Sequence, residues 1–417
     1  MERRKFIRNI SLGIGALPLL SASDFDVHES LKVPADKEAL MKDEKFWQKV
    51  RKQFNLDYSL LNLSNAGISP MPDSVLTSFH KAADFANKTP NINRHIQEKE
   101  MISVKEDIAK LAGCSAEELV VMRNATEAIN TILWGLDLKE GDEIIIANQD
   151  YSLVYTAAEH IAKTKKLSLK ILDIPLLPEN DKVLVDLYKN ALGPKTKLLL
   201  VTHMINWTGQ IMPVQEICAA AKEKGVYTLV DGAQSLAQFN FNLQEIDCDF
   251  FAASFHKWLC APPGTGMLYI KKSKIEKVSP IHAGLSPGSS SIDKFEAYGT
   301  HSFAEQLALK EAVNFHNKLG SDLKHRRLHY LQQLWREQVK DHPKIKFHTS
   351  SDIRSSAGIV LFTHSEMTPA KVIQALRKKK ILAGSALWKD NNGVRISPNI
   401  YTSAVEMQQL ALALKEL

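Results

Sequence analysis

The segment DFFAASFHKWLCAPPGTGMLYI, residues 249–270, places a lysine between an apolar run and a stretch rich in proline and glycine. The apolar run is typical of a buried strand that ends near Ser254, so Lys257 follows at the end of that strand. Lysine normally seeks water, whereas neighbours such as Trp258 indicate enclosure. Burial disfavours the charged form of lysine and frees its amine to act as a nucleophile. The segment therefore predicts a chemically active lysine.

The middle of the chain alternates strand-like and helix-like segments. Buried strands are expected at residues 143–147, 197–202 and 226–231, and a helix is expected over 214–224, ending at Gly225. This alternation predicts an α/β fold, in which a mostly parallel sheet carries helices on both faces. Ligands in such folds bind beyond the carboxyl ends of the strands.

The pattern changes after about Lys310. A long charged helical stretch runs to about Asp341, and two short strands and a helix follow at residues 345–348, 358–364 and 369–379. This order predicts a second, smaller α+β domain. In a chain of 417 residues we therefore expect the following parts: a segment 24–60 that joins the small domain, a large domain over 61–310 and the small domain over 311–417.

Composition limits the classes of partner. The net charge is +6, but the basic residues are dispersed. The densest basic cluster, residues 324–327, has a helical spacing that indicates a solvated face, so we expect no nucleic-acid partner. The four cysteines, Cys114, Cys218, Cys248 and Cys260, lie far apart and lack metal-ligand spacing. We expect buried free thiols and no metal site, although an exported protein could form a disulfide.

A nucleophilic amine needs a carbonyl partner, and pyridoxal 5'-phosphate (PLP) is the commonest one in enzymes. PLP requires an acid for its pyridine nitrogen, donors for its phosphate, a flat cover for its ring and an arginine for the substrate carboxylate. Asp231 ends the strand in VYTLVDGAQS and could be that acid, the alternative being a turn or helix-cap aspartate. Arg395, in GVRISPNIY, could clamp a carboxylate, the alternative being a surface ion pair.

The phosphate donors are sought at ATEAIN, residues 125–130. Thr126 can cap a helix there, and a helix N-terminus with free amides suits a phosphate. An ordinary threonine cap is the alternative. Ser254 and His256, beside the lysine, could add donors to the same phosphate. For His256 taken alone, a core or surface histidine is the alternative.

Together, the order and spacing of these residues resemble the class V aminotransferase family of PLP-dependent enzymes. The resemblance runs from LNLSNAGISPMP at Leu61 to RISPNIY at Arg395. Because of HKWLCAPPGTGMLYI and NQDYSLV, it looks closest to the isopenicillin-N-epimerase-like branch. It implies the PLP-dependent transferase fold type I, which is aspartate-aminotransferase-like and combines a large domain, built on a mostly parallel sheet, with a small α+β domain. It also implies a homodimer.

The resemblance assigns roles around the cofactor ring by position. It makes Lys257 the lysine that binds the cofactor covalently and shuttles protons, and Asp231 the partner of the pyridine nitrogen. Gln234 matches the residue that hydrogen-bonds the phenolic oxygen of the ring. Tyr151 falls where the family stacks an aromatic residue or a histidine, although Asp150-Tyr151 here replaces the Glu-His of many members.

Further positions match contacts to phosphate and substrate. The phosphate contacts are Ala125, Thr126, Ser254 and His256, joined by Thr300 in FEAYGTHSF, which is implied to reach the phosphate from the partner subunit. The positions near substrate or cofactor are Asn65 and Asn206, and the substrate-carboxylate arginine is Arg395.

The expected protein is a PLP-dependent enzyme that acts on the amino group or α-carbon of an amino acid or short peptide. We expect an aminotransferase, with an isopenicillin-N-epimerase-like epimerase as the alternative. A lyase or desulfurase is disfavoured: desulfurases of this family carry a catalytic cysteine before the arginine segment, and residues 381–398 contain none. Cys260 follows Lys257 too closely to replace it. A non-catalytic binding protein would be favoured by loss of Lys257 or Asp231, and both are present.

The N-terminus, MERRKFIRNISLGIGALPLLSASDF, resembles a twin-arginine export signal. Its apolar residues 10–20 are too few to span a bilayer comfortably as a helix, and the small residues 21–23 suit a cleavage site. We therefore expect a signal over 1–23, a periplasmic or otherwise exported protein, and no stable membrane anchor after cleavage. A basic, apolar arm of a cytoplasmic protein is the alternative.

Overall fold

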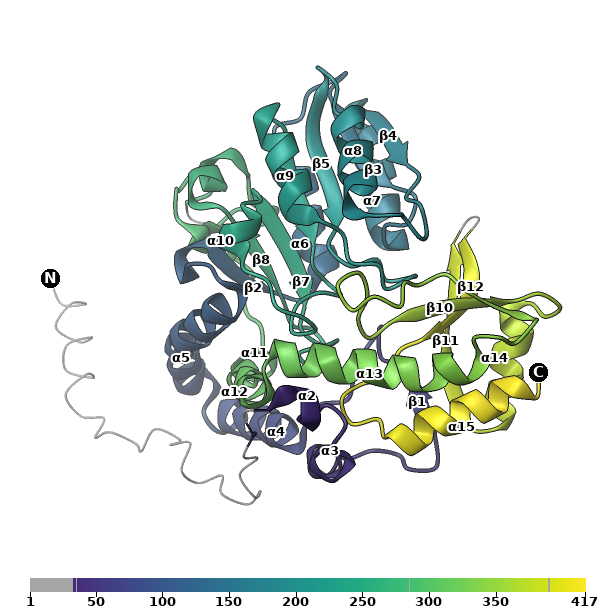
Figure 1. Cartoon of the computed structure of the whole chain (residues 1–417). Coiled ribbons are helices and arrows are strands. Elements are labelled where there is room, and N and C mark those ends of the chain that lie inside the picture. Colours follow the sequence, from purple (N-terminus) through teal and green to yellow (C-terminus); the bar gives the residue numbers. More distant parts are fainter. Residues whose placement is uncertain (1–32, 35, 285, 389–390) are drawn as a thin grey trace, which may run out of the picture. The chain divides into compact units, whose positions relative to one another are not determined.

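The computed structural model describes residues 33–417 except 35, 285 and 389–390 (Figure 1). The export signal expected over 1–23 and the beginning of the expected segment 24–60 lie outside these residues. Residues 33–417 form one compact unit, so the domain boundaries drawn from the sequence stay a prediction. Among the described residues, no helix is both long enough and apolar enough to cross a membrane.

The larger sheet has seven strands in the order β2-β8-β7-β6-β5-β3-β4. Strands β3 to β7 pair in parallel with their neighbours, and β8 runs antiparallel to both β7 and β2. The expected mostly parallel sheet is therefore confirmed. Its strands are β2 Leu119–Met122, β3 Glu143–Ala147, β4 Ser168–Leu172, β5 Thr196–Thr202, β6 Tyr227–Asp231, β7 Phe250–Ser254 and β8 Gly266–Ile270.

Helices cover both faces of this sheet, because its central strands are apolar on both sides. In β5, Leu199 and Val201 belong to one buried cluster, whereas Leu198 and Leu200 belong to another. Alternate residues of a strand point to opposite faces, so each face has its own core. The helices that alternate with the strands are α6 Ala125–Gly135, α7 Ser152–Lys165, α8 Asp181–Ala191, α9 Val214–Glu223 and α10 Leu243–Ile246.

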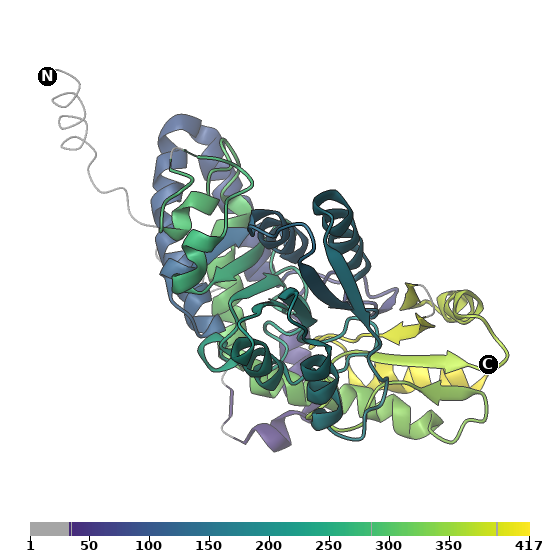
Figure 2. The ribbon, with the colours of Figure 1, turned by 90° about the horizontal axis from the view of Figure 1, so that it is seen from above.

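Two pairs of helices, one before and one after the larger sheet in the sequence, pack together as one group. Helices α4 and α5 pack against α11 and α12, although more than 190 residues separate the two pairs (Figures 1 and 2). The group comprises α4 Asp73–Lys88, α5 Pro90–Ala112, α11 Ala304–Leu307 and α12 Leu309–Leu319. Short 3₁₀ helices are η2 Ala116–Glu118, η3 Lys272–Lys277 and η4 Ile292–Phe295.

The second sheet has five strands in the order β1-β11-β12-β10-β9. Strand β1 begins at Leu61, where the larger domain was expected to begin, yet it pairs in parallel with β11 of this sheet. The strands are β1 Leu61–Leu63, β9 Ile345–Phe347, β10 Val360–His364, β11 Ile381–Trp388 and β12 Asn391–Ile396. The accompanying helices are α13 Ser321–Val339, α14 Pro369–Lys378 and α15 Ala404–Lys415.

Two details of the expected helical stretch from Lys310 to Asp341 differ in the structure. It is divided into α12 and α13 by Gly320, whose φ of 77° is a conformation that glycine adopts readily. The basic cluster 324–327 is not a solvated face, since Lys324 and Arg327 are only 2% and 0% exposed. That prediction was wrong because Arg327 packs under the N-terminal helices.

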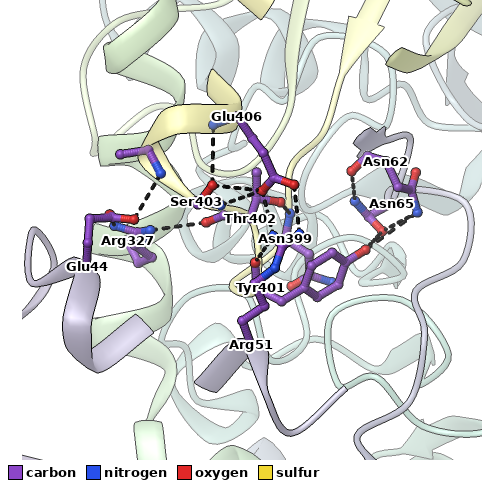
Figure 3. Close-up of polar contacts among 11 residues, drawn as sticks. Glu44, Arg51, Asn62, Asn65, Arg327, Asn399, Tyr401, Thr402, Ser403 and Glu406 are labelled. Carbon is purple, nitrogen blue, oxygen red and sulfur yellow. Dashed lines mark hydrogen bonds and ion pairs between the residues drawn. The ribbon is translucent and has the colours of Figure 1, made fainter. Parts of the chain in front are cut away.

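The segment before Leu61 is joined to the second sheet's helices by buried and partly buried polar contacts (Figure 3). Helix α2 spans Lys37–Leu40 and α3 spans Glu44–Arg51. Arg327 of α13 donates to Glu44 at 2.5 Å and to the carbonyl of Thr402 at 3.1 Å. Arg51 of α3 forms a bidentate pair with Glu406 of α15, at 2.6 and 2.8 Å. The guanidinium groups of Arg327 and Arg51 each donate to several acceptors, and they thereby hold α3 against α13 and α15.

Candidate active site

One cavity lies beyond the carboxyl ends of three adjacent parallel strands, as expected for this fold. Thr202, Asp231 and Ser254 are the last residues of β5, β6 and β7, and all three face it. Its empty space is about 360 Å³, including the part open to solvent. The lining residues are Ala125, Thr126, Tyr151, Val154, Thr202, Met204, Asn206, Asp231, Ala233, Gln234, Ser254 and Lys257.

Lys257 enters the cavity from the turn that follows β7. Burial lowers the pKa of its ammonium group to about 8, with the Asp231 carboxylate opposing this shift and the Arg395 guanidinium adding to it. Its Nζ lies 5.8 Å from the centre of the Tyr151 ring, so the amine faces an aromatic cover across the cavity. The lysine is therefore placed where its neutral, nucleophilic form is accessible near neutral pH.

Asp231 is only 4% exposed, and its Oδ1 accepts a hydrogen bond from the backbone N–H of Ala233 at 2.9 Å. Burial raises the pKa of this carboxyl group, while the Ala233 N–H and the charge of Lys257 act in the opposite direction. The next residue, Gly232, has no room for a side chain, because an added Cβ would lie 1.9 Å from Cζ of Phe251. The carboxylate is thus fixed in an enclosed position that suits a cationic ring nitrogen.

The N-terminus of α6 supplies polar groups at another wall of the cavity. Its cap is Asn124, whose side chain accepts from Glu127 N at 2.9 Å, so the expectation that Thr126 caps this helix was wrong. Ala125 N donates to Ser254 Oγ at 3.0 Å. Thr126 does not cap the helix. It lines the cavity at the first turn, where the helix dipole favours an anion.

Gln234 is held from two directions. Its Nε2 donates to the carbonyl of Ala66 at 2.9 Å, and its Oε1 accepts from Trp258 Nε1 at 2.8 Å. A primary amide carries two hydrogens on its nitrogen, so one remains for a ligand oxygen. Trp258 is 0% exposed and packs behind the lysine, as expected for a residue that encloses it.

Unpartnered buried atoms surround the expected carboxylate site. Arg395 of β12 donates from Nη1 to the carbonyl of Asn206 at 2.9 Å. Arg395 Nε and Asn206 Oδ1 are buried and find no hydrogen-bond partner among the described residues. Arg395 does not itself line the cavity, although Asn206 does. Buried polar atoms normally have hydrogen-bond partners, so these two atoms indicate a place for a ligand. The carboxylate of an amino acid could accept from Arg395, and its amine could donate to Asn206 Oδ1.

Besides Arg395, three predicted residues do not line the cavity. Asn65 is 0% exposed, and its amide is engaged by protein groups, including the hydroxyl of Tyr401 at 2.5 Å (Figure 3). His256 does not line the cavity, and its buried Nδ1 has no hydrogen-bond partner among the described residues. Thr300 is exposed and does not line the cavity within this chain. The roles expected for all three stay predictions.

Sequence reasoning missed the acidic neighbour of Tyr151 and its partner. Asp150 accepts from Thr202 Oγ1 at 2.7 Å and from Ala147 N at 2.8 Å. Burial, aided by repulsion from Asp231, raises the pKa of Asp150 to about 7, while the hydrogen bonds from Ala147 and Thr202 act in the opposite direction. Thr202 was findable, because it ends a strand next to the one that ends in Asp231. Asp150 links the end of β3 to the end of β5 and so fixes the approach of Tyr151.

The residues present fit PLP. Lys257 Nζ lies 5.8 Å from the centre of the Tyr151 ring, Asp231 ends the strand β6 beside β7, and the first turn of α6 offers Thr126. These are the four requirements of a Schiff-base lysine, a flat cover, an acid for the ring nitrogen and a phosphate cradle.

Comparison with known proteins gives relatives and structures that match over most of the chain. The family model for aminotransferase class-V matches residues 61–410. Isopenicillin N epimerase of Streptomyces clavuligerus is 27% identical over 401 residues, which cover 89% of this chain and 98% of the relative. A probable cysteine desulfurase of Synechocystis is 33% identical over 301 residues, covering 66% of this chain and 70% of the relative.

Solved structures agree in fold. A C-DES variant with glycine covalently linked to its PLP cofactor has a TM-score of 0.78 at 21% identity, covering 88% of this chain and 99% of that one. The cysteine desulfurase of Thermococcus onnurineus has a TM-score of 0.78 at 22% identity, covering 88% and 97%. The expected fold type I is confirmed by these structures, and the expected PLP cofactor by the family match. The chain belongs to the aminotransferase class-V family of PLP-dependent enzymes.

Proposed function

We propose that this protein is a PLP-dependent enzyme that removes the α-proton of an amino acid or short peptide carrying a free α-carboxylate. The observation that carries the proposal is the pairing of Lys257 and Asp231 at adjacent strand ends, in one cavity, with an aromatic ring 5.8 Å from the lysine amine. Burial lowers the pKa of Lys324 to about 8 as well, so the aromatic cover and the neighbouring Asp231 carboxylate, rather than the pKa, distinguish Lys257 as the active lysine.

The residues have distinct tasks in this proposal. PLP, when bound, supplies the electron sink for the charge left on the α-carbon. Lys257 Nζ first holds the cofactor and, once displaced by the substrate amine, accepts the α-proton. Asp231 holds a proton at the pyridine nitrogen, and its buried position keeps water from competing. Arg395 orients the substrate through its carboxylate, so that the α-hydrogen points to the lysine.

Where the proton goes next decides the reaction. Transfer to a carbon of the bound cofactor would give transamination, which is the activity we expected from the sequence. Delivery to the other face of the α-carbon gives epimerisation, and one observation favours this second candidate. The relatives that match nearly the whole chain include isopenicillin N epimerases. A desulfurase reaction is not proposed, since residues 381–398 hold no cysteine.

The test is to incubate the purified holoenzyme with a panel of L- and D-amino acids and dipeptides in D₂O. The visible spectrum, α-deuterium incorporation and products are recorded together. A keto acid with loss of the visible band identifies transamination, and deuterated product of inverted configuration identifies epimerisation. Lys257→Ala is the matched control and should lose deuterium incorporation. Exchange that persists in this variant contradicts the proposal.

We also propose that the protein is exported by the twin-arginine route. The support is Arg3-Arg4 followed by Phe6, Ile7 and a basic residue, ahead of the apolar residues 10–20. The experiment compares the periplasmic fraction of the full chain with that of an Arg3→Lys, Arg4→Lys double variant. Export of the first and retention of the second is expected. Equal distribution of both contradicts the proposal.

We propose, finally, a homodimer in which Thr300 completes the phosphate site of the partner subunit. The support is its family position together with its exposure outside its own chain's cavity. Sedimentation should give twice the mass of the chain, and Thr300→Val should weaken PLP binding without dissociating the dimer. A monomer that binds PLP tightly contradicts this arrangement.

A further inference from the structure

A lysine is buried directly behind the turn that carries Lys257. Lys324 of α13 is 2% exposed, and its Nζ lies 2.6 Å from the carbonyl oxygen of Trp258 and 3.2 Å from His316 Nδ1. In the described part of the chain it forms no ion pair with a carboxylate. A buried amine without such a partner is unfavourable compared with an apolar side chain of the same length. Its hydrogen bonds therefore need an explanation.

The contact falls next to the active lysine. The carbonyls on either side of Lys257 each accept a hydrogen bond from a distant part of the chain. The His256 carbonyl accepts from Ser69 N at 2.9 Å, and the Trp258 carbonyl accepts from Lys324. The peptide plane before Lys257 and the peptide plane after Trp258 are thus both fixed from outside the turn.

The turn itself is strained and needs such support. Cys260 has a φ of 57°, a left-handed conformation that non-glycine residues rarely adopt. Within the turn, Cys260 N donates to the Lys257 carbonyl at 3.3 Å. Cys260 Sγ offers the Trp258 carbonyl only a weak contact at 3.9 Å. Lys324 is therefore the strong donor to that carbonyl.

His316 completes the arrangement. It is 2% exposed, and burial, followed by the charge of Lys324, lowers its pKa well below the ordinary value, so its ring stays neutral. A neutral ring with its proton on Nε2 can donate to Ser321 Oγ at 3.1 Å and leave Nδ1 to accept from Lys324. The amine is held on one side by the imidazole and directed to the Trp258 carbonyl on the other.

We propose that Lys324 is a positioning residue for Lys257: its amine fixes the Trp258 carbonyl and thereby the turn that aims the active lysine into the cavity. The inference rests on the proposed function of Lys257. It predicts that losing the Lys324 amine loosens this turn and misaligns proton transfer, while the binding contacts made by Arg395 remain.

The chain offers a matched control in Lys294. This second buried lysine is 7% exposed, and its Nζ donates to the carbonyl of Ile275 at 2.8 Å, outside the active cavity. Lys324→Met and Lys294→Met therefore remove the same kind of contact from two places. Any general cost of losing a buried amine appears in both variants.

The first measurement is hydrogen–deuterium exchange of the cofactor-free protein, followed at the amides of Cys260 and Ala261. Lys324→Met should speed their exchange by roughly tenfold or more, since a buried carbonyl loses its strong donor, and Lys294→Met should leave them unchanged. Equal exchange in both variants overturns the proposal. Because neither cofactor nor substrate is present, this measurement tests the role of Lys324 independently of whether the proposed function is correct.

The second measurement separates positioning from a general structural role. In the holoenzyme, Lys324→Met should lower kcat by roughly tenfold and leave KM within about twofold, because proton transfer depends on lysine alignment and binding does not. A rise in KM with unchanged kcat overturns the proposal. If Lys324→Met does not fold, Lys324→Gln against Lys294→Gln gives the same comparison, with the same outcomes for and against.

Discussion

Capture of PLP by the cofactor-free protein should follow the protonation of Lys257. Only the neutral amine can attack the cofactor's aldehyde, and burial lowers the pKa of Lys257 from the ordinary value of 10.5 to about 8. A lowered lysine pKa means that the neutral form is gained as pH rises through 8. The capture rate should therefore climb about tenfold per pH unit below 8 and become level above it.

The size of the effect follows from the two pKa values. At pH 7 a lysine with a pKa of about 8 is neutral roughly 300 times more often than one with a pKa of 10.5. Removing the charge of Asp231 or that of Arg395 should shift the midpoint of the pH profile in opposite directions. Asp231→Asn removes the carboxylate that stabilises the ammonium and should lower the midpoint, whereas Arg395→Met removes a repelling charge and should raise it.

The assay is stopped-flow absorbance of cofactor-free protein mixed with PLP at a series of pH values. Nα-acetyl-lysine, measured in parallel, controls for the pH dependence of free PLP and should show its midpoint near the ordinary lysine value. A protein profile that keeps rising with the free amine, with no level region above pH 8, would refute the reasoning. The reasoning would also be refuted if the midpoint of the pH profile moved in the same direction in Asp231→Asn and Arg395→Met.

Three further changes test other parts of the account. Arg395→Met should raise KM by roughly 100-fold for substrates with a free α-carboxylate, and steady-state kinetics should show little loss for the matching α-amides; equal losses for both refute the clamp. Arg327→Met should destabilise the fold by about 3 kcal/mol in urea unfolding, because Glu44 and the carbonyls of Met41 and Thr402 each lose this donor, and an unchanged unfolding midpoint refutes that estimate. Gly232→Ala should lower both the melting temperature and PLP affinity, since its Cβ would collide with Phe251; calorimetry and titration check this, and wild-type values contradict it.

The strand-end residues could be predicted from the sequence because a local signal marks them. Asp231 and Ser254 each close an apolar run, and parallel strands bring their carboxyl ends to one edge, where Lys257 follows. The cap of α6 was equally readable, since Asn124 stands three residues before Glu127, a typical cap spacing. Thr126 was chosen instead, although it stands inside the first turn.

Other features depend on contacts between distant parts of the chain, so no local sequence pattern predicts them. Arg395 meets the Asn206 carbonyl only because β12 comes to lie beside the larger sheet's loops. The cluster around Lys324 and Arg327 has the spacing and charge of a solvated helix face, yet the N-terminal helices and the turn after β7 cover it. The pairing of β1 with β11 likewise joins residues more than 300 positions apart.

The most direct test of the account is to locate the covalent cofactor. The holoenzyme is reduced with borohydride, digested, and its peptides are examined by mass spectrometry. The account predicts a pyridoxyl group on Lys257, within the peptide that contains SFHKW. A pyridoxyl group on another lysine, or none after saturation with PLP, would contradict the assignment of this cavity as the active site.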